Sequence, residues 1–211
     1  MDYSEGYFKR FKNISKSLQT PESIYIRNII DNNLGDSYLD IGCGLGGNYD
    51  LIKNDYLEKN IVIGLDVSSF ALKSAKNKYN YAEFVQADVL KLPFKDNSFN
   101  LISALHIIEH LSDTHTFLSE LRRALKPGGA LVVATVDRDS FSRNLPGVKQ
   151  LIKDPTHINE FNFGELKEEV GRYFFIKDTR RTSKIYNFGL FNWLLNKILK
   201  PDLICIGEKK E

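Results

Sequence analysis

The chain has few cysteines, little net charge and no long apolar run. Only two of its 211 residues are cysteines, and Cys43 and Cys205 lie far apart with no partner at metal-ligand spacing. This argues against a disulfide scaffold and predicts reduced thiols, as in a cytoplasmic protein. A formal net charge of +2 gives no reason to expect nucleic acid as a partner.

No apolar run approaches the roughly 18 residues that a membrane-spanning helix needs. The first residues, Met1 to Glu5, have neither the basic nor the apolar region of a secretion signal, so none is expected. The hydrophobic fraction of 42% and the charged fraction of 27% are those of an ordinary globular protein. The length suits a single domain over 1–211.

Strand and helix patterns alternate along the first two thirds of the chain. This alternation predicts an α/β fold, a doubly wound parallel sheet with helices on both faces. Ligands of such sheets bind at the carboxyl ends of the strands. The predicted strands are Tyr38–Ile41, Ile61–Leu65, Glu83–Gln86, Leu101–Leu105, Ala130–Thr135, Arg172–Thr179 and Leu203–Glu208, and the predicted helices are Gly47–Lys53, Ser69–Lys78, Thr114–Leu125, Phe163–Val170 and Tyr186–Leu199.

A glycine-rich segment follows the first predicted strand. Four glycines lie between Gly42 and Gly47, where the backbone can turn tightly and approach a ligand. Glycines 42, 44 and 47 also satisfy the dinucleotide fingerprint, so a nicotinamide or flavin site is an alternative. Asp40 argues against it, because a carboxylate beside a diphosphate would be a like-charge contact. The segment suits a cationic ligand better.

Two further carboxylates follow the second and third strands. Asp66 is placed to accept hydrogen bonds from the two hydroxyls of a ribose. Asp88 is placed to accept from an exocyclic amine such as that of adenine. Either residue alone could simply cap a helix. Together with the glycines, at successive strand ends, they predict a nucleoside-containing ligand.

These segments resemble the motifs of class I S-adenosylmethionine-dependent methyltransferases, in the type 11 subgroup that includes quinone-biosynthesis enzymes. The resemblance covers residues 38–136 and continues more weakly through 154–161. It implies a Rossmann-like, seven-stranded, mostly parallel sheet with an antiparallel last strand. The similar segments are Asp40–Gly46, Gly64–Asp66, Gln86–Phe94, Phe99–Leu111 and Leu121–Gly129, with Asn100 where the family usually has an acid.

The resemblance implies S-adenosylmethionine as the cofactor and a role for each matching residue. Asp66 would hold the ribose hydroxyls, and Asp88 would accept from the adenine amine. Val67 would pack on adenine, and the Val89 amide would donate to the ring. The methionine part would lie on the glycine loop, near Asp40 and the Ala104 carbonyl. The full set of implied cofactor-binding residues is Asp40, Gly42, Gly44, Gly46, Asp66, Val67, Asp88, Val89 and Ala104.

Histidines near the expected methyl position are the candidate general bases. His106 follows the fourth strand, and His157 lies in a segment expected to cover the acceptor site. Glu109 and His110 are further candidates for the same role, although either could simply begin or cap a helix. A general base helps when the acceptor is a hydroxyl. No metal site is expected.

The resemblance divides the chain into an N-terminal cap (1–36), a cofactor-binding core (38–136) and substrate-side insertions (137–162 and 183–201). The expected function is methyl transfer to a small-molecule acceptor, with oxygen favoured. The alternatives are an RNA or protein methyltransferase, an NAD(P)-dependent oxidoreductase and a non-catalytic cofactor-binding module. The apolar residues of 186–199 suit core packing, a lipid-like acceptor pocket, a homodimer contact or a peripheral membrane contact.

Overall fold

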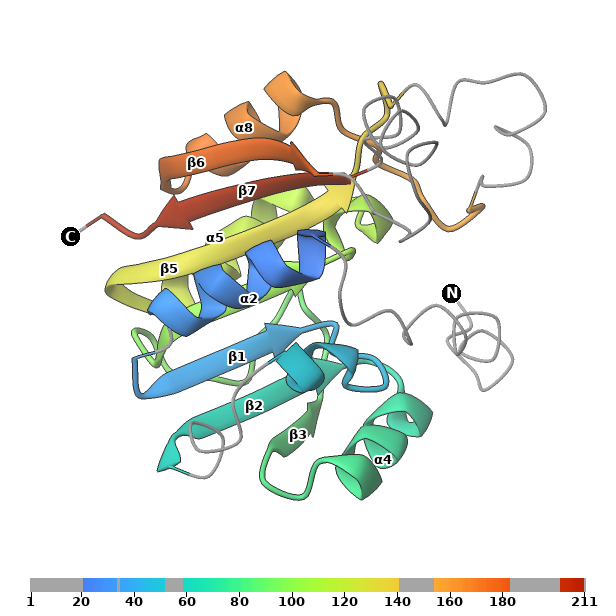
Figure 1. Ribbon diagram of the computed structural model, residues 1–211, viewed down its shortest axis with the longest axis vertical. Helices are drawn as coiled ribbons and strands as arrows, with labels where there is room; N and C mark the ends of the chain where they lie inside the picture. Colours follow the sequence, from blue (N-terminus) through green and yellow to red (C-terminus); the bar gives the residue numbers. More distant parts are fainter. Residues whose placement is uncertain (1–20, 34, 52–58, 141–153, 183–201, 211) are drawn as a thin grey trace.

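One seven-stranded sheet organises the chain. The structure is a computed structural model that describes residues 21–33, 35–51, 59–140, 154–182 and 202–210. Its strands follow the order β3-β2-β1-β4-β5-β7-β6 (Figure 1). They are β1 (Ser37–Ile41), β2 (Ile61–Asp66), β3 (Glu83–Gln86), β4 (Phe99–Leu105), β5 (Leu125–Val136), β6 (Phe175–Thr182) and β7 (Asp202–Glu208).

The sheet is mostly parallel. Strand β1 pairs in parallel with both β2 and β4, and β3 and β5 continue the parallel pairing outward. Strand β7 runs antiparallel to its neighbours β5 and β6. The predicted doubly wound α/β sheet with an antiparallel last strand is therefore confirmed. The strand order reverses between β1 and β4, and a crevice for ligands forms outside the carboxyl ends at such a point.

Helices cover both faces of the sheet. Helices α2 (Pro21–Asn33) and α4 (Ser69–Lys78) pack on one face, and α5 (Thr114–Ala124) and α8 (Phe163–Gly171) pack on the other. Figure 1 shows α2 in front of the sheet and α5 behind it. Alternation along β1 supplies both cores, because Leu39 and Ile41 face α5 while Tyr38 faces α2.

The elements agree with the prediction in the core and differ at its margins. Helix α4 has the predicted bounds, and the Ser68 hydroxyl caps it by accepting from the Ala71 amide. The helical segment predicted at 47–53 is a 3-10 helix, η1, over Gly47–Leu51, and its last two residues lie outside the described residues. Strand β6 starts later than predicted because α8 continues to Gly171. Helix α2 was not predicted, and 186–199 lies outside the described residues.

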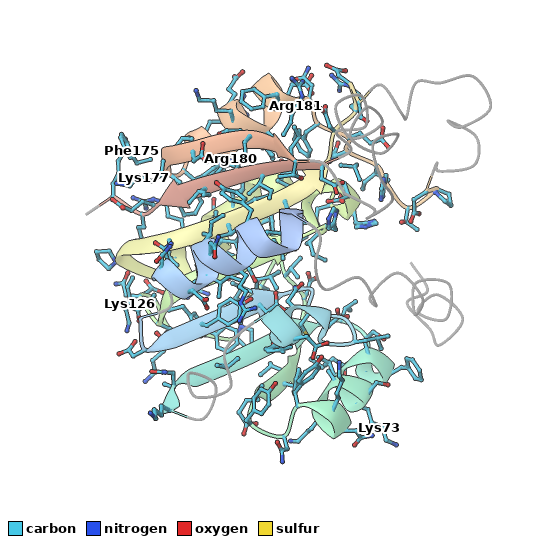
Figure 2. All side chains as sticks on the ribbon, in the orientation of Figure 1. Lys73, Lys126, Phe175, Lys177, Arg180 and Arg181 are labelled. Carbon is cyan, nitrogen blue, oxygen red and sulfur yellow. The ribbon has the colours of Figure 1, made fainter. Side chains whose placement is uncertain are left out.

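Strand β6 is an edge of the described sheet. It carries Lys177, Arg180 and Arg181, which Figure 2 labels beside the exposed Phe175. Arg181 Nε donates to Asp137 Oδ2 at 2.6 Å. Charged side chains on an edge strand oppose pairing with another sheet edge. Among the helices in the described part of the chain, none combines the length and apolarity needed to cross a membrane.

Candidate active site

A cavity of about 280 Å³ opens at the carboxyl ends of the parallel strands. The loops after β1, β2, β3 and β4 all contribute to it, so it lies where the fold places ligands. It brings together most of the residues predicted to bind a cofactor. Its lining residues are Gly42, Gly44, Asp66, Val67, Asp88, Val89, His106, Ile107, His110 and Leu111.

The glycine loop after β1 adopts a conformation that favours glycine. Gly42, Gly44 and Gly46 have φ angles of +67°, +53° and +79°. The Gly42 amide donates to the Leu65 carbonyl at 2.7 Å, and the Cys43 amide donates to the same oxygen at 3.0 Å. These bonds hold the loop against the end of β2. Side chains would strain this turn, because L-residues disfavour positive φ.

The Asp66 carboxylate ties the first two loops together. Its Oδ2 accepts from the Gly44 amide at 2.9 Å, and its Oδ1 accepts from the Ser68 amide at 2.8 Å. Burial raises the pKa of Asp66, and the amide bonds oppose that rise. Asp66 therefore lines the cavity and also shapes the glycine loop.

The residues expected around adenine lie on the neighbouring loops. Val67 is 52% exposed although it lines the cavity, as expected of an apolar side chain that a ligand would cover. Asp88 Oδ1 accepts from the Leu90 amide at 2.9 Å, which fixes the turn after β3. Val89 completes this side of the wall. The arrangement offers one carboxylate and two apolar surfaces.

Asp40 is buried beneath the glycine loop and does not line the cavity. The Ser103 hydroxyl donates to Asp40 Oδ1 at 2.6 Å, and Asn48 Nδ2 donates to both carboxylate oxygens at 3.2 Å. The register places Asp40 opposite Ser103 on β4. Burial raises the pKa of Asp40 to about 6, while the Ser103 and Asn48 bonds oppose the rise and the Asp66 charge adds to it.

This pKa predicts how stability depends on pH. Between pH 3.8 and about 6 the folded protein binds a proton at Asp40 that the unfolded chain releases, so this residue's contribution to stability falls as pH rises. The shift corresponds to about 3 kcal/mol. From pH 4 to pH 7, D40N should therefore gain up to about 3 kcal/mol in unfolding free energy relative to the wild type, measured by urea denaturation.

Asp36 provides a control of opposite sign. Its hydrogen bond to Lys126 lowers its pKa, and it lies exposed before β1. D36N should lose stability relative to the wild type as pH rises. Parallel pH profiles for wild type and D40N would refute the account of Asp40.

His106 and Glu109 form a pair just past β4. His106 has a φ of +57°, and its Nδ1 donates to Glu109 Oε1 at 3.3 Å. The Glu109 side chain is 1% exposed, whereas that of His106 is 38% exposed. Burial raises the pKa of Glu109, but the bond and charge of His106 outweigh it, so the pKa lies below its usual value. The carboxylate thus orients the imidazole at the cavity wall.

Some predicted residues do not line the cavity, and some residues that line it were not predicted. Gly46, Ala104 and His157 do not line the cavity, and Ala104 is fully buried. Ile107, His110 and Leu111 do line it, but they are not among the residues predicted to bind the cofactor; His110 is one of the candidate bases. All three follow β4 directly, on or beside the 3-10 helix η2 (Ile108–His110). Their position directly after a predicted strand is the sequence feature that could have identified them.

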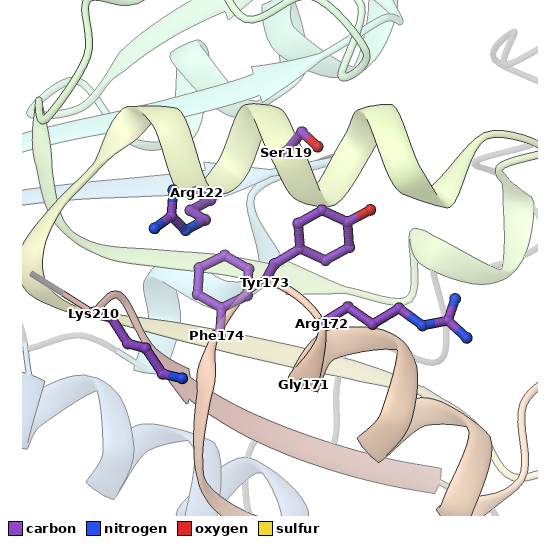
Figure 3. Close-up of a pocket in the computed structure, with 7 residues that line it drawn as sticks. All are labelled: Ser119, Arg122, Gly171, Arg172, Tyr173, Phe174 and Lys210. Carbon is purple, nitrogen blue, oxygen red and sulfur yellow. The ribbon is translucent and has the colours of Figure 1, made fainter.

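A second cavity, of about 410 Å³, lies where helices α5 and α8 end (Figure 3). Arg122 of α5, Arg172 after α8 and Lys210 after β7 line it. Arg172 already pairs with Glu168 and Glu169. Because α5 and α8 both end here, before β5 and β6 begin, this cavity lies away from the carboxyl ends where the first one opens.

Comparison with known proteins agrees with the motifs. A family model described as a methyltransferase domain matches residues 39–133. A probable S-adenosylmethionine-dependent methyltransferase of Mycolicibacterium smegmatis is 35% identical over 64% of this chain and 49% of its own length. An uncharacterised protein of Methanocaldococcus jannaschii is 35% identical over 77% of this chain and 68% of its own length. The chain belongs to the class I S-adenosylmethionine-dependent methyltransferases.

More distant matches extend over nearly the whole chain. A ubiquinone/menaquinone biosynthesis C-methyltransferase of Campylobacter jejuni is 26% identical over 87% of this chain and 85% of its own length. A putative methyltransferase, solved with the Haloferax volcanii Trm112 activator, has a TM-score of 0.75 at 16% identity, covering 98% of this chain and 95% of that one. The predicted family and its cofactor are confirmed. The chain spans about half the length of several curated relatives that it matches.

Proposed function

We propose that this chain transfers a methyl group from S-adenosylmethionine to a small-molecule acceptor, with oxygen as the favoured acceptor atom. The observation that carries the proposal is the shared cavity of the glycine loop, Asp66 and Asp88. The described residues of the lining include two carboxylates and no lysine or arginine, which suits a positively charged sulfonium ligand and disfavours a diphosphate. Bound there, S-adenosylmethionine would supply an activated methyl group.

The residue roles that we propose follow the geometry. Gly42 and Gly44 leave room for the methionine part to approach the backbone. Asp66 would accept from the ribose hydroxyls, while Asp88, Val67 and the Val89 amide would hold adenine. The backbone of Gly46 would belong to the same loop. Asp40 and the Ala104 carbonyl, both buried, would act on the cofactor's amino group only through intervening groups.

His106 is the better-placed general base. Its Nδ1 donates to Glu109, so the neutral ring keeps a lone pair on Nε2. That nitrogen would take the proton from an acceptor hydroxyl as the oxygen gains the methyl group. His157, the second candidate, lies outside the cavity lining. The rest of the protein's contribution is alignment, which can supply on the order of 7–11 kcal/mol.

The acceptor class rests on two observations. The relative from Campylobacter jejuni that matches most of the chain acts in quinone biosynthesis, so a small organic acceptor fits. The near-neutral charge gives no electrostatic basis for binding RNA. RNA or protein methylation is the alternative; the family match argues against NAD(P)-dependent oxidation. A homodimer, a membrane contact through 186–199, the cytoplasmic location and the domain boundaries stay predictions.

Titration calorimetry tests the cofactor directly. S-adenosylmethionine and S-adenosylhomocysteine should each bind at one site per chain, and NAD should not bind. Binding of NAD alone would overturn the proposal. A screen with radiolabelled methyl donor against phenols, quinols, RNA and protein would then separate small-molecule from macromolecular acceptors.

A further inference from the structure

Three potential metal ligands meet beside the cavity. Glu109 and His110 belong to η2, and His157 comes from the segment after residue 153. One ligand atom from each lies within 4.8 Å of the others. The rings of His110 and His157 are 4.9 Å apart, inclined at 73°. Two nitrogen donors and one carboxylate thus face a common point.

The Glu109 carboxylate lacks a partner on one side. His106 donates to Oε1, whereas Oε2 is buried and has no partner at hydrogen-bond distance among the described residues. The Thr135 hydroxyl, also without a partner at that distance, lies near enough to help lower the pKa of this carboxyl. An unsatisfied buried carboxylate oxygen costs more than an unsatisfied neutral group. A cation bound at Oε2 would remove that cost.

Backbone hydrogen bonds hold the two contributing segments together. The amides of Ile158 and Asn159 both donate to the Glu109 carbonyl, at 2.9 and 3.0 Å. The His157 amide donates to the Asp154 carbonyl at 3.2 Å. The cluster is therefore part of a fixed junction between η2 and the 154–160 segment.

The hydrogen bonds of the histidines leave nitrogens available as ligands. His110 Nδ1 donates to the Thr156 carbonyl at 3.1 Å, which leaves a lone pair on Nε2. His157 Nδ1 lies 3.5 Å from Glu160 Oε1, but it is buried and has no hydrogen-bond partner among the described residues. His110 therefore directs its second nitrogen to a carbonyl, as metal-binding histidines usually do, while His157 keeps a buried nitrogen without a partner.

We propose that Glu109, His110 and His157 bind one divalent transition-metal ion of the zinc class. Two imidazoles and a carboxylate suit such ions, whereas Mg²⁺ and Ca²⁺ prefer oxygen ligands. Zinc–ligand bonds of about 2.0–2.1 Å require ligand atoms roughly 3.3 Å apart, so the separations, which reach up to 4.8 Å, would shorten by up to about 1.5 Å. Three protein ligands leave a coordination position open.

The open coordination position would allow the ion to bind an oxygen of the acceptor. His110 lines the cavity and also belongs to the cluster, so the ion would lie against the cavity wall. A bound ion lowers the pKa of an oxygen that it holds. The site would therefore favour hydroxyl acceptors. The sequence alone predicted no metal, because the ligands are distant in the chain and only folding brings them together.

Metal titration of the full chain tests the proposal. Zn²⁺ should bind with one-to-one stoichiometry by calorimetry, and Co²⁺ should give the visible absorption of a low-coordinate site. E109Q and H157A should each weaken Zn²⁺ binding by about 100-fold or more. H115A is the matched control, since His115 is exposed on α5, outside the cluster, and this variant should bind as the wild type does.

The two variants keep the test decisive. E109Q preserves the shape of a buried side chain, and H157A changes one nearer the surface, so at least one should fold, as circular dichroism would verify. Absence of stoichiometric Zn²⁺ binding would overturn the proposal, as would unchanged affinity in a folded variant. Since the titrations contain no S-adenosylmethionine, failure here would leave the proposed methyltransferase function to be judged by its own titration.

Discussion

D66A should weaken S-adenosylmethionine binding by about 100-fold or more. Two charge-assisted hydrogen bonds to ribose hydroxyls, as we propose, are worth about 1.5–3 kcal/mol each, and about 1.4 kcal/mol corresponds to tenfold in affinity. The variant also removes the acceptor for the Gly44 and Ser68 amides, which loosens the glycine loop. Both effects act in the same direction. Titration calorimetry measures the affinity.

An analogue of S-adenosylhomocysteine without ribose hydroxyls separates the two effects. If Asp66 acts through the hydroxyls, the wild type should bind the analogue weakly, and D66A should lose little further affinity for it. If Asp66 acts only by shaping the loop, D66A would lose the same factor in affinity for S-adenosylhomocysteine and for the analogue. E83A is the control, because Glu83 is exposed at the far end of β3. Unchanged affinity in folded D66A would refute the assigned role.

The sequence predicted the core of the fold because its signals are local. Strand β3 and helix α4 have the predicted bounds, since alternating patterns and the Ser68 cap mark them within a few residues. Helix α2 lacked such a signal. The helical segment predicted at 47–53 follows a glycine turn, where local patterns indicate a helix but do not distinguish an α-helix from the 3-10 helix that forms.

The sequence predicted the positions of those site residues whose place in the fold follows from the backbone alone. Asp66 ends β2 and Asp88 lies two residues past β3, so both must lie at the carboxyl ends of the strands, where the cavity opens. Asp40 differs, since its strand position points it toward Ser103 and away from the cavity. The approach of His157 to His110 could not be predicted, because it depends on how the 154–160 segment folds back onto η2.

G42A should destabilise the protein by about 2–5 kcal/mol. A non-glycine residue at a φ of +67° costs roughly 1–2 kcal/mol. A Cβ at this position would also overlap Cγ1 and Cδ1 of Ile107, and overpacking typically costs about 1–3 kcal/mol. Urea unfolding measures the loss. G47A is the control, because a Cβ there meets nothing within 4 Å, and the change should stay within about 0.5 kcal/mol.

The double variant G42A/I107A separates backbone strain from steric overlap. Removing the Ile107 side chain abolishes the overlap but leaves the positive φ, so the two substitutions should be less destabilising together than their sum, by about 1–3 kcal/mol. Strict additivity would show that backbone strain alone explains the glycine. Because Ile107 lines the cavity, a favourable coupling would also mean that the size of this side chain and the absence of one at Gly42 together set the shape of the cavity.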